Sequence, residues 1–214
     1  MLAVIICLAG IFAILVVAEI LHKRKILHGE YLRKFVHIPS GAFIAFWPWL
    51  ISWRAIQLIS LAMLAVVLIN HRTRSIHISG DIKRPTYGGV LFPVAVIIAA
   101  ALTREKIFFA IAILHMAVAD GMAAVIGTAY GKKLAYKVFH QVKTVLGTMA
   151  FWLASLYILG VGILFAHDLI SFTNYALLLL VLPPILAALE NLAVLGLDNV
   201  VVPVAVIAAL QLAT

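Results

Sequence analysis

An aspartate interrupts an apolar segment near the middle of the chain. The run from Ile107 to Gly127 carries Asp120 among apolar and small residues. An ionisable side chain within a membrane helix is costly, so such residues are usually functional. A structural alternative is a buried ion pair between Asp120 and a lysine, for which Lys143 is one candidate. We therefore treat Asp120 as the first candidate site residue.

Residues typical of phosphate-binding sites follow Asp120 in the sequence. They are glycines, lysines and threonines, namely Gly121, Gly127, Gly131, Lys132, Lys133, Lys143, Thr144, Gly147 and Thr148. Glycines leave backbone N–H groups accessible to an anion, lysines supply charge, and a helix beginning near Thr144 would direct its positive end toward a phosphate. The spacing is not that of a P-loop, and no strand is predicted before it. Two alternatives stay open: positive-inside topology for the lysines and close helix packing at Gly127.

The composition indicates that these residues are positioned by membrane helices. Of the 214 residues, 65% are hydrophobic and 11% are charged, and apolar runs recur along the whole chain. This combination excludes a soluble globular protein. It predicts an all-α polytopic membrane bundle forming a single domain over residues 1–214. The single cysteine, Cys7, excludes a disulfide framework and a thiolate metal cluster.

The apolar runs predict about eight transmembrane helices, with seven as the alternative. The first is expected to be a retained span, because it lacks the basic start and small-residue cleavage site of a signal peptide. The expected spans are Leu2 to Leu21, Val36 to Ile51, Ala55 to Ile69, Val90 to Leu102, Ile107 to Gly127, Val145 to Ala166, Leu169 to Leu189 and Val200 to Leu212. Pro183 and Pro184 are expected to kink or break the seventh span.

The basic residues predict which loops face the cytoplasm. Most of the 16 lysines and arginines fall on one side of the predicted bundle, namely Lys23, Arg24, Lys25, Arg33, Lys34, Arg72, Arg74, Lys83, Arg84, Lys132, Lys133, Lys137 and Lys143. Cytoplasmic loops of membrane proteins are enriched in such residues. We therefore expect loops 22–35, 70–89, 128–144 and 190–199 in the cytoplasm and both termini outside.

Further polar residues gather on the same side. Glu190 and Asp198 lie at the ends of the last predicted loop, while Arg84 and Gly88 lie in the second. Acidic residues among basic loops suggest a site for a metal and a phosphate. The expected site is therefore formed by residues 22–37, 70–89, 120–148 and 190–199 on the cytoplasmic face.

Five blocks of residues, taken in order, resemble one family. They are Arg33-Lys34-x-x-His37, Arg84-x-Thr86-Tyr87-Gly88-Gly89, Ala119-Asp120-Gly121-x-Ala123 with Gly127 and Gly131-Lys132, Lys143-Thr144-x-x-Gly147-Thr148, and Glu190 with Leu197-Asp198-Asn199-x-x-x-Pro203. This order resembles the dolichol kinase, phytol kinase and yeast-type diacylglycerol kinase family and spans nearly the whole chain. The chain is similar in size to the compact prokaryotic and phytol-kinase-like members.

The resemblance implies a phosphoryl transfer from a nucleoside triphosphate, generally CTP, to the hydroxyl of a membrane lipid. An isoprenoid alcohol or diacylglycerol would be the acceptor, and Mg²⁺ or another divalent cation the cofactor. Asp120, Lys143, Glu190 and Asp198 are then the expected catalytic residues, with Asp120 and Glu190 as metal ligands and Asp198 as an alternative second ligand. The expected nucleotide-binding residues are Gly121, Gly127, Gly131, Lys132, Thr144, Gly147, Arg84, Gly88, Arg33, Lys34 and His37.

Two other classes of protein remain as alternatives. A CTP-dependent lipid-phosphate cytidylyltransferase or a phosphatidyltransferase would share the Asp-Gly pair, but the phosphatidyltransferase pattern requires further aspartates that are missing between Gly121 and Ala166. A transporter or assembly subunit for an anionic lipid would favour inverted repeats, and none is evident. Nucleic acid binding is not expected, because the basic residues are dispersed over four membrane loops. The sequence leaves the oligomeric state open.

Overall fold

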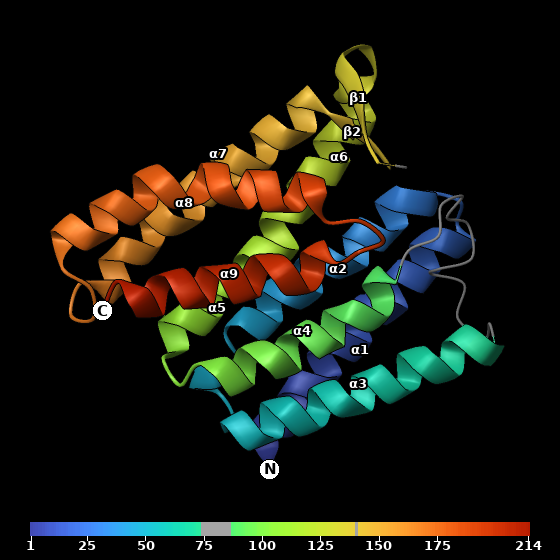
Figure 1. Cartoon of the computed structure of the whole chain (residues 1–214). Helices are drawn as coiled ribbons and strands as arrows, with labels where there is room; N and C mark the ends of the chain where they lie inside the picture. The colour runs from blue at the N-terminus through green and yellow to red at the C-terminus, as the bar shows by residue number, and fades with distance from the viewer. Residues whose placement is uncertain (74–86, 140) are drawn as a thin grey trace.

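The computed structural model describes residues 1–73, 87–139 and 141–214. Within these residues the α-helices are α1 (Leu2–Lys23), α2 (Gly29–Ala45), α3 (Trp53–Thr73), α4 (Gly88–Leu102), α5 (Lys106–Leu114), α6 (Asp120–Tyr130), α7 (Val145–Ala166), α8 (Phe172–Leu192) and α9 (Asp198–Leu212). A π-helical turn, η3 (His115–Ala119), makes α5 and α6 one continuous helix. The predicted all-α bundle is confirmed, and eight helices result when α5 and α6 are counted together (Figure 1).

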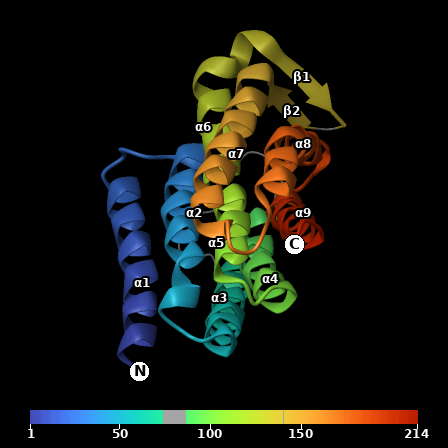
Figure 2. The same cartoon turned by 90° about the vertical axis from the view of Figure 1, so that its left-hand side faces the viewer.

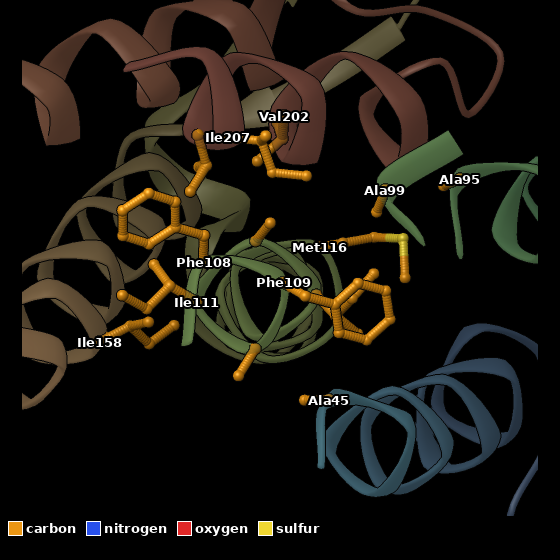
Figure 3. Close-up of a cluster of buried hydrophobic side chains, with 14 of the residues drawn as sticks. Ala45, Ala95, Ala99, Phe108, Phe109, Ile111, Met116, Ile158, Val202 and Ile207 are labelled. Carbon is orange, nitrogen blue, oxygen red and sulfur yellow. The ribbon is translucent and has the colours of Figure 1, made fainter. Parts of the chain in front are cut away.

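The helix formed by α5 and α6 is the centre of the bundle. Within its most apolar window 67% of the residues are buried, against 17% for α1 and for the described part of α3. Figure 3 shows Phe108, Phe109 and Met116 projecting from this helix toward surrounding helices. The neighbours contribute Ala99 from α4 and Val202 from α9. The peripheral helices therefore expose apolar side chains where lipid would contact them, as expected for a membrane bundle.

Five of the described helices are long and apolar enough to cross a membrane, namely α1, α3, the continuous helix Lys106–Leu134, α7 and α8. Helices α4 and α9 are apolar but shorter. The predicted span Val145 to Ala166 coincides with α7. Helix α8 continues through Pro183 and Pro184, so the break considered there does not occur, and Glu190 lies in its last turns rather than in a loop.

The second predicted span was misplaced. Val36 to Ile51 was expected, whereas α2 runs from Gly29 to Ala45 and is followed by a short 3₁₀ turn at Trp47–Trp49. The charged residues at the start of α2 suggested a loop, because a hydropathy profile scores every charged side chain as if it were exposed to water. Arg33 instead pairs with Glu30 on the same helix, and Lys34 pairs with Asp120 of α6. Paired charges can be accommodated within a helix that packs against protein.

A β-hairpin that the sequence did not predict lies between α6 and α7. After a 3₁₀ turn at Gly131–Leu134, strand β1 (Ala135–Val138) pairs antiparallel with β2 (Gln141–Thr144). The register places Tyr136 opposite Lys143. Phe139, which follows β1, has a φ of 52°, a left-handed conformation common in short hairpin connections. Strand β2 leads directly into α7, whose N-cap residue is Thr144.

The hairpin and several helix ends meet at one end of the bundle. Figure 1 shows the hairpin, the connection from α1 to α2 and the connection from α8 to α9 at this end, while both termini lie at the other. Figure 2 shows α1 at the edge of the molecule and the hairpin extending beyond the ends of α6 and α7. This arrangement agrees with the predicted alternation of spans, which assigned these connections to one side and the termini to the opposite side.

Candidate functional site

A cavity of about 710 Å³ lies at the end of the bundle that carries the hairpin. It is surrounded by the start of α2, helix α6, the hairpin, the start of α7, the end of α8 and the start of α9. The residues that line it are Glu30, Arg33, Asp120, Ala123, Ala124, Gly127, Thr128, Lys132, Ala135, Gln141, Val142, Lys143, Thr144, Gly147, Thr148, Glu190, Gly196, Asp198 and Asn199. Three of the four predicted segments therefore meet here. Among the described residues of the fourth segment, 70–89, none lines the cavity, and Arg84 lies outside the described residues.

Three carboxylates from three helices converge in this cavity. Asp120 begins α6, Glu190 lies near the end of α8, and Asp198 begins α9. One carboxylate oxygen from each of these three residues lies within 4.8 Å of the corresponding oxygens of the other two. Asp120 and Glu190 are buried and Asp198 is half-buried. Because like charges at this separation repel, the group requires nearby cations.

Asp120 has its cationic partner on α2. Lys34 Nζ donates to Asp120 Oδ2 at 2.5 Å, and the Lys34 side chain is only 1% exposed. His37 Nε2 lies 3.4 Å from the same oxygen and 3.0 Å from the carbonyl oxygen of Met116. Neither Lys34 nor His37 lines the cavity. Both were predicted to bind a nucleotide, but the structure places them behind Asp120, where they orient its carboxylate.

The π-helical turn η3 directly precedes Asp120. A π turn inserts an extra residue into a helix and rotates the side chains that follow, and such turns often occur at functional sites. Here the turn also contains Met116, whose carbonyl oxygen lies within hydrogen-bonding distance of His37. The local backbone irregularity thus helps to fix the direction of Asp120.

A second ion pair joins the hairpin to α8. Lys143 Nζ donates to Glu190 Oε1 at 2.5 Å and to the carbonyl oxygen of Glu190 at 3.0 Å. Both residues line the cavity. Arg33 also lines it and donates to both carboxylate oxygens of Glu30, at 2.6 and 3.1 Å. With the exposed Lys132, these cations form the positively charged part of the cavity wall.

The glycines bring α6 and α7 into close contact. A Cβ atom at Gly127 would lie 2.7 Å from Thr144 Oγ1, and one at Gly147 would lie 2.9 Å from the carbonyl oxygen of Ala123. Gly131 likewise packs against Thr144. Thr144 caps α7, since its Oγ1 accepts the N–H of Gly147 at 3.0 Å. Close helix packing therefore accounts for these glycines, although Gly127 and Gly147 also line the cavity.

The two remaining predicted glycines lie outside the cavity lining. A Cβ atom at Gly121 would overlap Ile38 of α2, so this glycine permits the contact between α2 and α6. Gly88 is buried at the start of α4. Neither position supports direct contact with a ligand in the cavity.

Sequence reasoning missed a hydrogen-bonded group that holds the hairpin. Tyr136 Oη lies 2.6 Å from Thr148 Oγ1 and donates to Asn191 Oδ1 at 2.6 Å. Asn191 Nδ2 lies 3.1 Å from Thr148 Oγ1 and donates to the carbonyl oxygen of Ala187 at 2.8 Å. Tyr136 and Asn191 belong to no motif and lie far apart in the chain, so no local signal identified them.

Comparison with known proteins gives one informative relative. A curated protein from Synechocystis sp., named as a phytol kinase, is 31% identical to this chain over 198 residues. The alignment covers 89% of the chain and 82% of the relative. No family model and no solved structure matches the chain.

Proposed function

The chain belongs to the phytol kinase family of lipid-alcohol kinases, and we propose that it transfers the terminal phosphoryl group of CTP to the hydroxyl of an isoprenoid alcohol. Phosphorylation of a lipid alcohol by an integral membrane protein follows from the family and the apolar helices. CTP as donor, Mg²⁺ as cofactor and a prenyl acceptor such as phytol, geranylgeraniol or a polyprenol are the more specific parts of the proposal.

The observation that carries the proposal is the meeting of acidic and basic groups in one cavity. Phosphoryl transfer depends mainly on positioning and on neutralising phosphate charge. The cavity provides three carboxylates within 4.8 Å of one another, with Lys143, Lys132 and Arg33 in the same wall. This combination suits a triphosphate that carries a divalent cation better than it suits a purely apolar substrate.

The donor atoms fit a divalent cation. Carboxylate oxygens are preferred ligands of Mg²⁺. Asp120 and Glu190 each have a lysine partner, whereas Asp198 forms no ion pair within the described part of the chain. The three carboxylates therefore outnumber the lysines paired with them. Asp120, Glu190 and Asp198 would hold the cation, which when bound supplies positive charge beside the phosphates.

The side chains of the cavity wall have separate roles in this proposal. Lys143 exchanges its contact with Glu190 for a phosphate oxygen, while Lys132 and Arg33 provide further charge. Lys34 and His37 keep Asp120 oriented from behind. A carboxylate oxygen of Asp120, Glu190 or Asp198 that does not contact the cation accepts the proton of the attacking alcohol.

The decisive experiment uses purified protein, Mg²⁺ and CTP labelled in either the γ or the α phosphate. Phytol, geranylgeraniol, a longer polyprenol and diacylglycerol are offered as acceptors. We expect label from γ-labelled CTP in a prenyl alcohol and none from α-labelled CTP. Label from the α phosphate would instead identify cytidylyl transfer. Absence of labelled lipid with CTP and ATP across the panel would refute the kinase proposal.

We also propose that the cavity faces the cytoplasm, so that the alcohol enters from the inner leaflet. His28 and Lys137 are exposed at the end of the bundle that contains the cavity, while Asp168 is exposed in the connection between α7 and α8 at the other end. Cysteines introduced at positions 28 and 137 should react only with a cytoplasmic reagent, and a cysteine at 168 only with an external one. The reverse pattern would contradict the proposed orientation.

A further inference from the structure

One buried polar atom of the cavity wall has no partner among the described residues. Asn199, the second residue of α9, is 3% exposed and lines the cavity. Its Oδ1 atom accepts no hydrogen bond within the described part of the chain. A buried acceptor without a partner costs free energy, so such an atom in a native structure requires an explanation. Among the residues that the structure describes, the other buried side-chain atoms without a partner, such as Ser60 Oγ and Trp47 Nε1, belong to residues that do not line the cavity.

The orientation of the Asn199 amide is fixed by its neighbours. Nδ2 donates to the carbonyl oxygen of Gly196 at 3.0 Å and lies 3.4 Å from Asp198 Oδ1. Reversing the amide would place Oδ1 against these two oxygens, which would repel it. The turn that presents the Gly196 carbonyl includes Leu195 and Gly196, both with positive φ values of 59° and 92°. The free oxygen is therefore a consequence of this turn.

The surroundings of Oδ1 favour a cation over a hydrogen-bond donor of a nucleotide base. Asp198 immediately precedes Asn199 and belongs to the group of three carboxylates. Lys34 and Lys143 are paired with the other two carboxylates, which leaves excess negative charge next to Asn199. Amide oxygens are common ligands of hard divalent cations.

We propose that Asn199 Oδ1 is an additional ligand of the divalent cation held by Asp120, Glu190 and Asp198. This inference rests on the proposed function, because it concerns the same cation. The turn at 195–197 then positions two adjacent oxygen ligands at the start of α9. These are the charged carboxylate of Asp198 and the neutral amide oxygen of Asn199. A neutral oxygen completes the coordination without adding to the repulsion among the carboxylates.

The test measures the binding of Mn²⁺ to the purified protein in the absence of nucleotide. Electron paramagnetic resonance monitors the binding. Asn199→Leu removes the oxygen and also the hydrogen bond to Gly196. Asn199→Asp loses the same hydrogen bond but keeps an oxygen at this position. Asn174→Leu is a matched control, since the Asn174 side chain donates to the carbonyl oxygen of Ala213 at the opposite end of the bundle. We expect the Kd for Mn²⁺ to rise about tenfold or more in Asn199→Leu, and to stay within a few-fold of wild type in the other two variants.

Three outcomes would contradict the proposal in distinguishable ways. Equal weakening in Asn199→Leu and Asn199→Asp would show that the turn at Gly196, and not the oxygen, controls binding. An unchanged Kd in Asn199→Leu, with weaker binding in Asp120→Asn, would refute the role of Asn199 but retain the carboxylate site. Absence of specific Mn²⁺ binding in the wild-type protein would refute the metal site of the proposed function together with this inference.

Discussion

Two lysine–carboxylate pairs with the same contact distance lie in different parts of the cavity region. Lys34 and Asp120 join α2 to α6, and Lys143 and Glu190 join the hairpin to α8, each with a 2.5 Å contact. The Lys34 side chain is 1% exposed and lies behind the cavity, whereas the Lys143 side chain is 14% exposed and lies in the cavity wall. Burial thus gives one lysine a fixed partner and leaves the other accessible to a ligand.

A lysine beside a carboxylate therefore has no single role in this site. A fully buried pair is hard to separate, because loss of either partner leaves a charge without solvation. A pair at the rim of a cavity can be solvated or can exchange its partner. We therefore assign Lys34 to positioning and Lys143 to phosphate contact within the proposed reaction.

The largest expected effect comes from Asp120→Asn. This variant keeps the shape of the side chain but removes the charge that a divalent cation requires, so transfer should fall by about 10³-fold or more. It also leaves Lys34 without a counterion, which should lower the free energy of unfolding by up to about 3–5 kcal/mol. The measurements are turnover with labelled CTP and thermal unfolding in detergent.

The double variant Lys34→Met/Asp120→Asn separates these two effects. Removing both charges should restore most of the stability but none of the activity. Normal turnover in folded Asp120→Asn would contradict the mechanism, and recovery of activity in the double variant would show that Asp120 acts only as a structural partner.

Replacing each lysine by methionine tests the comparison between the two ion pairs directly. Lys143→Met should reduce kcat/KM by about 10²-fold, because it removes a charge from the phosphates. It should lower the free energy of unfolding by only about 1–2 kcal/mol, because the Lys143 side chain is 14% exposed and lines the cavity, so that water can occupy the position it leaves beside Glu190. Lys34→Met should destabilise the protein by about 3–5 kcal/mol. Equal destabilisation by the two substitutions would remove the distinction drawn between the pairs.

The smallest expected effect concerns the support of Lys143. Tyr136 is the cross-strand neighbour of Lys143 and contacts Asn191, the residue that follows Glu190. The cross-strand pair Tyr136 and Lys143 thus contacts two successive residues of α8. Tyr136→Phe removes one hydroxyl, which should raise KM for the nucleotide about 5- to 10-fold, corresponding to a hydrogen bond of about 1 kcal/mol.

Tyr157→Phe is the matched control, because Tyr157 is 73% exposed on α7. It should leave KM unchanged. A normal KM in Tyr136→Phe would show that the hairpin does not need this attachment to position Lys143.

Local composition was sufficient to predict the membrane bundle and the first candidate residue. The span Val145 to Ala166 was predicted at its observed bounds, because hydropathy is a property of neighbouring residues. Asp120 stood out for the same reason, as a charge within an apolar run. The family resemblance similarly grouped Glu190 and Asp198 with Asp120, and the structure brings these three carboxylates together.

The pairing of the charged side chains could not be predicted from the sequence, because it depends on how the helices pack. Lys34 and Asp120 are 86 positions apart, and the lysine named from the sequence as one candidate partner of Asp120 was Lys143. The pairing depends on how α2 packs against α6, where Gly121 accommodates Ile38. The hairpin depends in the same way on the contacts of Tyr136 with α7 and α8. Such long-range contacts are set by the packing of whole helices, which no local pattern of residues encodes.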